Sequence, residues 1–425
     1  MLCFNILISL NHFFVTLRIN SVILNYEHMR IVSLFICILL ITGCKKEERS
    51  VDNLIKVDVL ETSYPEKELF LQDFMEVEYI PLETNDTFLT HGFVQDVGEK
   101  YIIVKNRKND GDIFIYDRSG KALRKFNRKG QGGEEYINIL GIALDESHEE
   151  IFVNSHHSQR ILVYDLFGNY KRTLKYKATK GSFASDPLKA EISSFYSDIF
   201  NYDKDHLICY DMFNSRYPFV LMSKKDGSIT KYINIPFDEK RMAMAMRKDE
   251  NRGLVESVSF GYYRTILSFR KEWFLLEFSS DTIYQLLPNY DLSPICVRTP
   301  PVDSMSPEIF LMIRLLSDRY IFMETVKNEY DFDKNKGFSR KFFLYDKEQD
   351  EFFNYRVYNK DYSSKKEIYM NVLRPIGGEI GAWQEIDAFS LLESLEKGEL
   401  KGKLENIART LDEDSNPVIM LIKNK

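Results

Sequence analysis

Short apolar stretches separated by turn residues make up most of the chain beyond residue 60, and many of them alternate apolar and polar positions. Such alternation predicts β-strands, because successive side chains of a strand point to opposite faces. Two stretches share one pattern, DIFIYDRSGKALRKF at 112–126 and RILVYDLFGNYKRTL at 160–174. In each, a strand ends in Tyr-Asp, a turn contains glycine and a second strand follows, which predicts a β-hairpin.

These hairpins belong to a longer repeat, since Tyr116 and Tyr164 hold equivalent places about 48 residues apart. Looser copies of the hairpin occur at 219–235 and 342–357, with a degenerate one at 279–289. A further pair of strands precedes each of the first two hairpins, at 92–98 with 101–106 and at 139–146 with 150–155. Four strands per repeat is the content of one propeller blade, and blades must stack around a centre to bury both faces.

Two segments interrupt the strand pattern. Residues 388–411 carry leucine and isoleucine at helical spacing, which predicts one or two helices before the last strand. Residues 236–256 are expected to form a second helical or loop insertion. We further expect the strand within VEYIPL (77–82) or the strand VIMLIK (418–423) to complete the sheet of the opposite terminus.

Three stretches carry a resemblance to a known family: VEYIPLET at 77–84, FIYDRSGKALRKFNRKGQGGEEY at 114–136 and DSNPVIMLIK at 414–423. They are similar to the bacterial six-bladed β-propeller lipoproteins, distant relatives of NHL-repeat propellers. Gly133 and Glu134 depart from the Pro-Gly that this family tends to show in the second stretch. The resemblance implies an all-β fold, a six-bladed propeller of four-stranded antiparallel blades with short helical insertions. It implies little about function, because one fold hosts many activities.

The amino-terminal region predicts export and a lipid anchor. Residues 29–43 have the arginine and the apolar core of a signal peptide, and the core is too short to span a bilayer comfortably. Ile41-Thr42-Gly43 followed by Cys44 resembles the bacterial lipobox, so Cys44 is the expected site of lipid attachment. We expect translation to start at Met29, with residues 1–28 a mis-annotated start, residues 44–74 a tether and residues 75–425 the propeller. An outer membrane lipoprotein facing the periplasm or the cell surface follows from this assignment.

Composition excludes some classes of function. The formal net charge of −7 argues against a nucleic-acid surface, which needs a positive footprint. Cys209 and Cys296 both lie in apolar strand-like runs, and we expect buried thiols rather than a disulfide. The Gly130–Gly133 stretch lacks the spacing and the following helix of a dinucleotide-binding loop, so it is expected to connect two blades.

Few residues suggest chemistry. His156 and His157 lie in an expected loop between two strands, where neighbouring side chains diverge, so surface histidines are favoured over a shared metal ligand set. Asp331, Asp333 and Asn335 alternate oxygen-bearing side chains and are the best candidates for a calcium ion, although an ordinary acidic surface turn is the favoured explanation. Trp383 lies in a loop-like stretch and is the aromatic candidate for ligand contact, with core packing as the alternative.

These observations favour a binding or interaction module over an enzyme, with a ligand or partner protein at the loop-rich mouth of the propeller channel. No cofactor is expected, with calcium as the alternative. A metal-assisted hydrolase or lyase acting on a glycan or lactone is the rival reading, and a structural partner of an outer-membrane complex is the third. The expected partners are the membrane, through the lipid anchor, and a glycan or an outer-membrane protein.

Overall fold

A computed structural model describes residues 54–61, 63–176, 194–249 and 253–425. Within the part of the chain that the structure describes, residues Ile55–Lys425 form one compact unit, called the second unit because residues before it are assigned separately, and it holds the whole fold described below. The predicted signal peptide at residues 29–43, the predicted lipid site Cys44 and the predicted false start at residues 1–28 lie outside the described residues.

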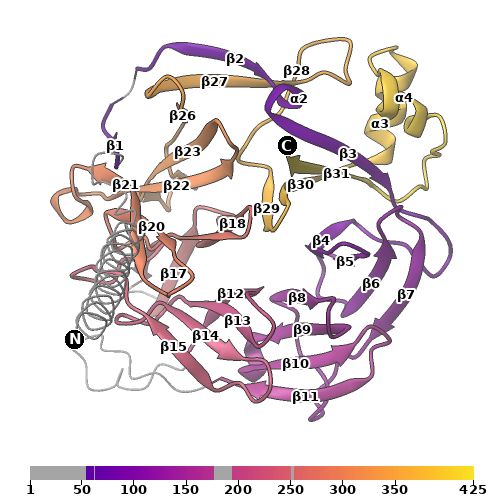
Figure 1. Cartoon of the computed structure of the whole chain (residues 1–425), viewed down its shortest axis with the longest axis horizontal. Helices are drawn as coiled ribbons and strands as arrows, with labels where there is room; N and C mark the ends of the chain where they lie inside the picture. Colours follow the sequence, from indigo (N-terminus) through magenta and orange to yellow (C-terminus); the bar gives the residue numbers. More distant parts are fainter. Residues whose placement is uncertain (1–53, 62, 177–193, 250–252) are drawn as a thin grey trace, which may run out of the picture. The chain divides into compact units, whose positions relative to one another are not determined.

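Six sheets surround a common axis in the second unit, and each is one blade of a β-propeller (Figure 1). The blades follow one another along the chain, and in each the chain begins at the innermost strand and moves outward. The first blade consists of β4 (Phe93–Val97), β5 (Tyr101–Lys105), β6 (Asp112–Asp117) and β7 (Ala122–Asn127). The second blade consists of β8 (Gly141–Asp145), β9 (Glu150–Ser155), β10 (Arg160–Asp165) and β11 (Tyr170–Lys175). The third blade consists of β12 (Tyr196–Asn201), β13 (His206–Asp211), β14 (Phe219–Ser223) and β15 (Ile229–Ile233).

The remaining blades include strands from both ends of the unit. The fourth blade consists of β18 (Ile266–Phe269), β19 (Glu272–Leu275), β20 (Thr282–Leu286), β21 (Leu292–Thr299) and β1 (Ile55–Asp58). The fifth blade consists of β22 (Ile309–Leu316), β23 (Tyr320–Lys327), β26 (Arg340–Asp346), β27 (Glu351–Asn359) and β2 (Glu66–Phe70), with β28 (Lys366–Glu367) paired to β27. The sixth blade consists of β29 (Arg374–Gly377), β30 (Ile380–Ile386), β31 (Val418–Asn424) and β3 (Met75–Pro81). The predicted six-bladed all-β propeller is confirmed.

The repeated hairpin forms for the reason that its sequence suggests. Asp117 Oδ1 accepts a hydrogen bond from the amide of Ser119 at 2.8 Å, and Gly120 has a φ of +87°. Asp165 and Gly168 make the same turn one blade later, with a φ of +80° at the glycine. The aspartate therefore caps the turn, and glycine takes the left-handed conformation that other residues disfavour.

Hydrophobic clusters between neighbouring blades form the core, and one cluster occupies each of the six interfaces. Strand β5 shows how a blade serves two interfaces: Ile102 and Val104 pack toward the sixth blade, while Ile103 packs toward the second. Alternate side chains of a strand point to opposite faces, so a strand between two blades is apolar on both. This explains the continuous apolar runs at the strand centres.

The two ends of the unit close the ring together. Strand β3 pairs antiparallel with the carboxyl-terminal strand β31, from Met75 opposite Asn424 to Pro81 opposite Val418. The expectation that one terminal strand completes the sheet of the other is confirmed. Figure 1 shows both strands in the sixth blade, between the first and fifth.

The predicted tether at residues 44–74 needs a correction. Within it, β1 pairs in parallel with β21, with Ile55 opposite Cys296, and β2 pairs in parallel with β27. The segment therefore adds an outer strand to the fourth and fifth blades before it enters the sixth through the short helix α2 (Leu71–Phe74). Charged residues dominate β2, EKELF, and hid it from the sequence pattern, since an edge strand buries little side chain.

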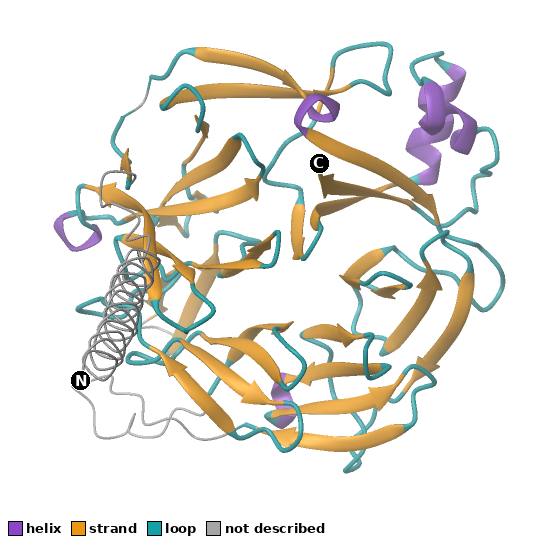
Figure 2. Ribbon diagram, in the orientation of Figure 1, coloured by secondary structure: helices purple, strands orange, loops and turns teal. Residues whose placement is uncertain are grey.

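The two predicted insertions have different outcomes. Residues 388–411 contain α3 (Ala388–Glu396) and α4 (Gly402–Ala408), as expected, and Figure 2 shows them side by side at the outside of the ring. The helix or loop predicted over 236–256 is confirmed only as a loop over 236–243, because the stretch then enters a hairpin of β16 (Met244–Asp249) and β17 (Leu254–Ser259). Pairing with β17 outweighs the helix propensity of alanine, methionine and lysine in MAMRKD.

Cys209 and Cys296 are buried, unlinked thiols, as predicted. Burial raises the pKa of Cys296 to about 12 and that of Cys209 well above its usual value. Across the described ranges, no helix has the length and apolar character needed to cross a membrane.

Candidate functional site

The histidine pair lies where the sequence predicted, in the connection between β9 and β10. His156 to Ser158 form the 3₁₀ turn η2 (His156–Ser158), and the two imidazole centres are 5.7 Å apart. The His156 ring packs at 3.9 Å from the ring of Phe195, and burial lowers its pKa. His157 instead lines a cavity of about 250 Å³ on the neighbouring blade, with its amide bonded to Asn138 Oδ1 at 3.2 Å.

The predicted calcium candidates form a turn between β24 (Tyr330–Asp331) and β25 (Lys336–Gly337). Asp331 Oδ1 accepts the amides of Asp333 and Lys334 at 3.1 and 3.0 Å. Asp333 instead pairs with Arg247 at 2.5 Å, and the Asn335 side chain bonds to Tyr330. The three side chains therefore have separate partners, and the described residues contain no group of three or more His, Cys, Asp or Glu suited to a metal ion.

Trp383 does not lie in a loop, as predicted, but in strand β30. Its side chain is 2% exposed and packs edge-on against Phe93, with ring centres 5.6 Å apart. An alternating strand residue facing the neighbouring blade becomes core, so the indole offers no free face to a ligand.

One end of the channel gathers residues that the sequence did not single out. The blades repeat by rotation around the axis, so their innermost strands begin at the same end, which we call the mouth. Connections between the second and third strand of each blade also lie there, including those with His156, His157 and the Asp331 turn. The arginine–aromatic cluster at the mouth consists of Phe93, Arg107, Tyr262, Arg264 and Arg374.

Arg374, the first residue of β29, stands at the centre of this cluster. Its guanidinium carbon is 4.4 Å from the ring centre of Tyr262, 4.8 Å from Phe93 and 6.0 Å from Trp383. Burial lowers the pKa of Arg374, Tyr262 opposes that change, and the charges of Arg107 and Arg264 lower it further. Arginine stays protonated despite such shifts, so the group is a cation held beside two others.

The two neighbouring arginines differ from Arg374 because each has a carboxylate partner. Arg264 donates to Asp198 at 2.5 Å and lies 5.3 Å from the Tyr262 ring centre. Burial alone would lower the pKa of Arg264, but Tyr262 and Asp198 together raise it. Asp198 also accepts the hydroxyl of Thr265 at 2.8 Å, so this pair is fixed from two sides.

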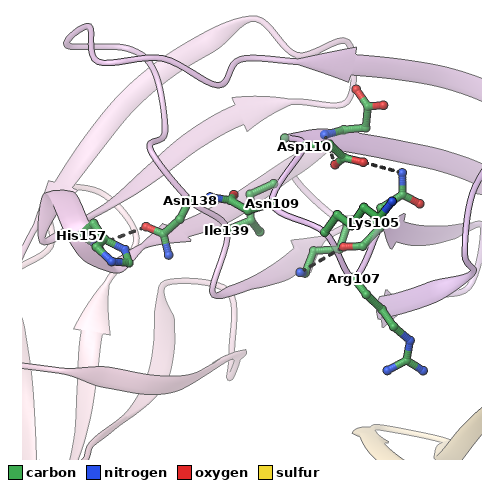
Figure 3. A pocket seen from close by; sticks show the side chains of 11 residues that line it. Lys105, Arg107, Asn109, Asp110, Asn138, Ile139 and His157 are labelled. Atoms are coloured by element: carbon green, nitrogen blue, oxygen red, sulfur yellow. Dashed lines mark hydrogen bonds between the residues drawn. The ribbon is translucent and has the colours of Figure 1, made fainter.

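Arg107 connects the mouth with the cavity beside it. It pairs with Glu385 of the sixth blade, and its guanidinium carbon lies 4.9 Å from the Phe93 ring centre. Figure 3 shows its side chain extending away from the other labelled residues of the cavity. Lys105 on the same wall has a pKa that burial lowers, and its ammonium lies 5.3 Å from Phe93.

Two arginines, the buried Arg314 and the partly buried Arg340, hold the segment that carries Tyr262 and Arg264. Arg314 donates to the carbonyl of Tyr262 at 2.8 Å, and Arg340 donates to the carbonyl of Phe260. Both arginines also pair with Glu324, whose side chain is 0% exposed. Backbone outside regular structure is thereby fixed, which prepares the Tyr262 ring for contact without a further ordering cost.

A carboxyl group lies deeper in the channel, on the innermost strand of the first blade. Asp96 accepts the amide of Leu144 at 2.7 Å, which links the first and second blades. Burial raises the pKa of Asp96 to about 6, although Arg264 and two backbone hydrogen bonds oppose the shift.

The mouth residues share a signal that sequence analysis missed. Phe93 and Arg374 are the first residues of innermost strands, and Tyr262 and Arg264 come directly before another. Once a propeller is assumed, a charged or aromatic residue at that place must face the channel entrance. The sequence-predicted residues, by contrast, lie on the second, fifth and sixth blades and do not form one site.

Comparison with one solved structure supports the fold, and two others show weaker likeness. The chain is similar to a protein of Bacteroides fragilis provisionally described as exported, with 14% identity, a TM-score of 0.54 and coverage of 88% of this chain and 99% of that one. A member of the duf4221 family from Bacteroides vulgatus has 12% identity, a TM-score of 0.45 and coverage of 82% and 97%. Virginiamycin B lyase from Staphylococcus aureus has 10% identity, a TM-score of 0.34 and coverage of 82% and 99%. At these identities the likeness extends to the fold alone.

No curated protein matches the sequence at a significant level. One protein family does, and its match covers residues 54–423, from the first described residue almost to the last. The chain belongs to the family described as Domain of unknown function (DUF4934).

Proposed function

We propose that this protein is a lipid-anchored extracytoplasmic binding protein, and that its ligand site is the arginine–aromatic cluster at the mouth. The carrying observation is Arg374, a cation beside two other arginines and without a carboxylate partner among the residues described. A buried or half-buried charge usually has a partner, so an unpaired one at a channel entrance suggests that the partner is a ligand.

The location rests on the amino-terminal sequence. A signal-peptide core followed by a lipobox-like Ile41-Thr42-Gly43-Cys44 supports export and an anchor in the outer membrane. In this proposal, ten residues separate Cys44 from the start of β1 at Ile55.

The anchor is tested by growing cells with a clickable palmitate analogue. We expect label on the membrane-bound protein, and loss of both label and membrane association in Cys44→Ser. Cys37→Ser is the matched control, because Cys37 lies in the predicted signal peptide and should not change either readout. Unchanged labelling of Cys44→Ser would contradict the anchor.

The site is tested by native mass spectrometry of the protein extracted from its own membranes in mild detergent. We expect a bound small molecule of constant mass, reduced in Tyr262→Ala and Arg374→Gln. Tyr232→Ala is the control, because this tyrosine lies 46% exposed on β15, the outer strand of the third blade. Equal adducts in all variants would place the ligand elsewhere, and absence of any adduct would count against a small-molecule site.

A further inference from the structure

We infer that the mouth binds an oxyanion, a carboxylate or sulfate on an acidic ligand, through the guanidinium groups of Arg374 and Arg107. This inference rests on the proposed binding function and names the chemistry of its ligand. The inference concerns only the anionic group that the arginines bind. The rest of the ligand would contact the surrounding channel.

The first argument is charge. The positive charges of Arg107 and Arg264 lie close enough to Arg374 to lower its pKa. Asp198 and Glu385 pair with Arg264 and Arg107, and Asp96 also interacts with Arg264, whereas Arg374 has no carboxylate pair among the described residues. The cluster is thus locally positive on a chain whose formal net charge is −7, and it is where an anion is most stabilised.

The second argument is geometry. The ring centres of Tyr262 and Phe93 lie 4.4 Å and 4.8 Å from the Arg374 guanidinium carbon, and the Tyr262 hydroxyl also accepts a hydrogen bond from this guanidinium. The N–H groups project from the edge of the plane, and their fork matches the two oxygens of a carboxylate or sulfate. Arg107 contacts the same Phe93 ring at 4.9 Å, so a second fork lies within reach of one anion.

The third argument is that the cluster is fixed before a ligand arrives. Arg314 holds the carbonyl of Tyr262 at 2.8 Å, and Asp198 holds Arg264. Burial raises the pKa of Tyr262, so its hydroxyl stays protonated and can donate a hydrogen bond. A cation already placed among fixed donors loses little entropy on binding an anion.

The chain supplies its own reporter for the test. It contains two tryptophans. Trp383 lies 6.0 Å from the Arg374 guanidinium, whereas Trp273 packs against Tyr202 in the hydrophobic cluster between the third and fourth blades. Trp273→Phe therefore leaves a single fluorophore beside the mouth. The mature protein with this change is titrated with sodium glucuronate, sodium sulfate, glucose and sodium chloride, at constant ionic strength.

We expect a saturable change in Trp383 emission with glucuronate or sulfate, and none with glucose or chloride. A response to glucuronate alone indicates a carboxylate ligand, and a response to sulfate alone indicates a sulfated one. Arg374→Gln should weaken the affinity by about tenfold or more, the size expected for a lost charged hydrogen-bond pair. Arg374→Lys, which keeps the charge but not the fork, should lose part of that affinity.

Arg124→Gln is the matched control, because its guanidinium also lies over an aromatic ring, Phe167 at 4.0 Å, but on the outer strand β7. It should leave the titration unchanged. Equal responses to glucose and glucuronate, or undiminished oxyanion affinity in Arg374→Gln, would overturn the inference. If native mass spectrometry shows an adduct that depends on Tyr262 but the titration shows no oxyanion response, the oxyanion inference is wrong. The proposed binding site is then still supported.

Discussion

Two groups of arginines lie on either side of the same backbone segment, residues 260–265, and they behave in opposite ways. The inner network consists of Arg314, Arg340 and Glu324, in which both cations share one carboxylate and also bond to main-chain carbonyls. The arginine–aromatic cluster at the mouth has aromatic neighbours and an unneutralised Arg374. The inner network supports the structure, whereas the cluster at the mouth is the proposed ligand site. Both groups consist of arginines, so the difference between them is whether each arginine has a carboxylate partner.

The largest effect is expected where the inner network is broken. Glu324→Gln leaves Arg314, whose side chain is 2% exposed, as a buried cation without a charged partner. The free energy of unfolding should fall by about 3–5 kcal/mol, as for other buried ion pairs that lose one member. Urea unfolding at neutral pH measures this. A loss below about 1 kcal/mol would mean that solvent reaches the network.

A smaller loss is expected at the paired arginine of the mouth. Asp198→Asn removes the charge opposite Arg264 while keeping an acceptor for Thr265. The free energy of unfolding should decrease by about 1–3 kcal/mol, because a charged hydrogen bond becomes a neutral one. Urea unfolding detects the change, and a stability equal to that of Glu324→Gln would erase the distinction between the two groups.

Asp96 gives a prediction with a defined pH dependence. Its folded pKa of about 6 exceeds the ordinary 3.8, so the folded protein binds this proton more tightly than the unfolded chain. Its contribution to stability is therefore present below pH 3.8 and is lost as pH rises through about 6. Asp96→Asn should remove this dependence. The difference in the free energy of unfolding between variant and wild type should therefore shift by about 3 kcal/mol in favour of the variant as pH rises from below to above this range. Urea unfolding across the range compares the two slopes, and parallel curves would contradict it.

The smallest effect on stability is expected at Arg374. Arg374→Gln removes a cation that repels its neighbours and lacks a carboxylate partner, so the free energy of unfolding should change by no more than about 0.5 kcal/mol. Thermal unfolding without added anions measures this. A large loss would show that Arg374 supports the fold, which would remove the contrast with the inner network.

The fold was largely predictable because its signals are local. Tyr116 and Tyr164 occupy matching positions in β6 and β10, both fully buried, and the glycine turns after them take the expected left-handed conformation. Leucine spacing over 388–411 gave the two helices for the same reason. The hairpin at 244–259 was missed because its first strand, MAMRKD, consists mostly of residues with high helix propensity and does not alternate apolar and polar residues.

The site was not predictable in the same way. Trp383 was a candidate because its stretch reads as a loop, yet it packs between the first and sixth blades, which is the core packing given as the alternative. Phe93, Tyr262 and Arg374 are far apart along the chain, and nothing local distinguishes them from other aromatic or basic residues. These residues come together only because the blades follow one another in a fixed order around one axis.

The sequence by itself determined the strands, the hairpin turns, the repeat and the closing role of the terminal segments, because side-chain periodicity and turn chemistry act between residues that are near neighbours. Only the tertiary structure decided which arginines receive a carboxylate. That choice depends on which side chains from separate blades share the channel mouth, and charge balance is a property of that assembled space rather than of any stretch of chain.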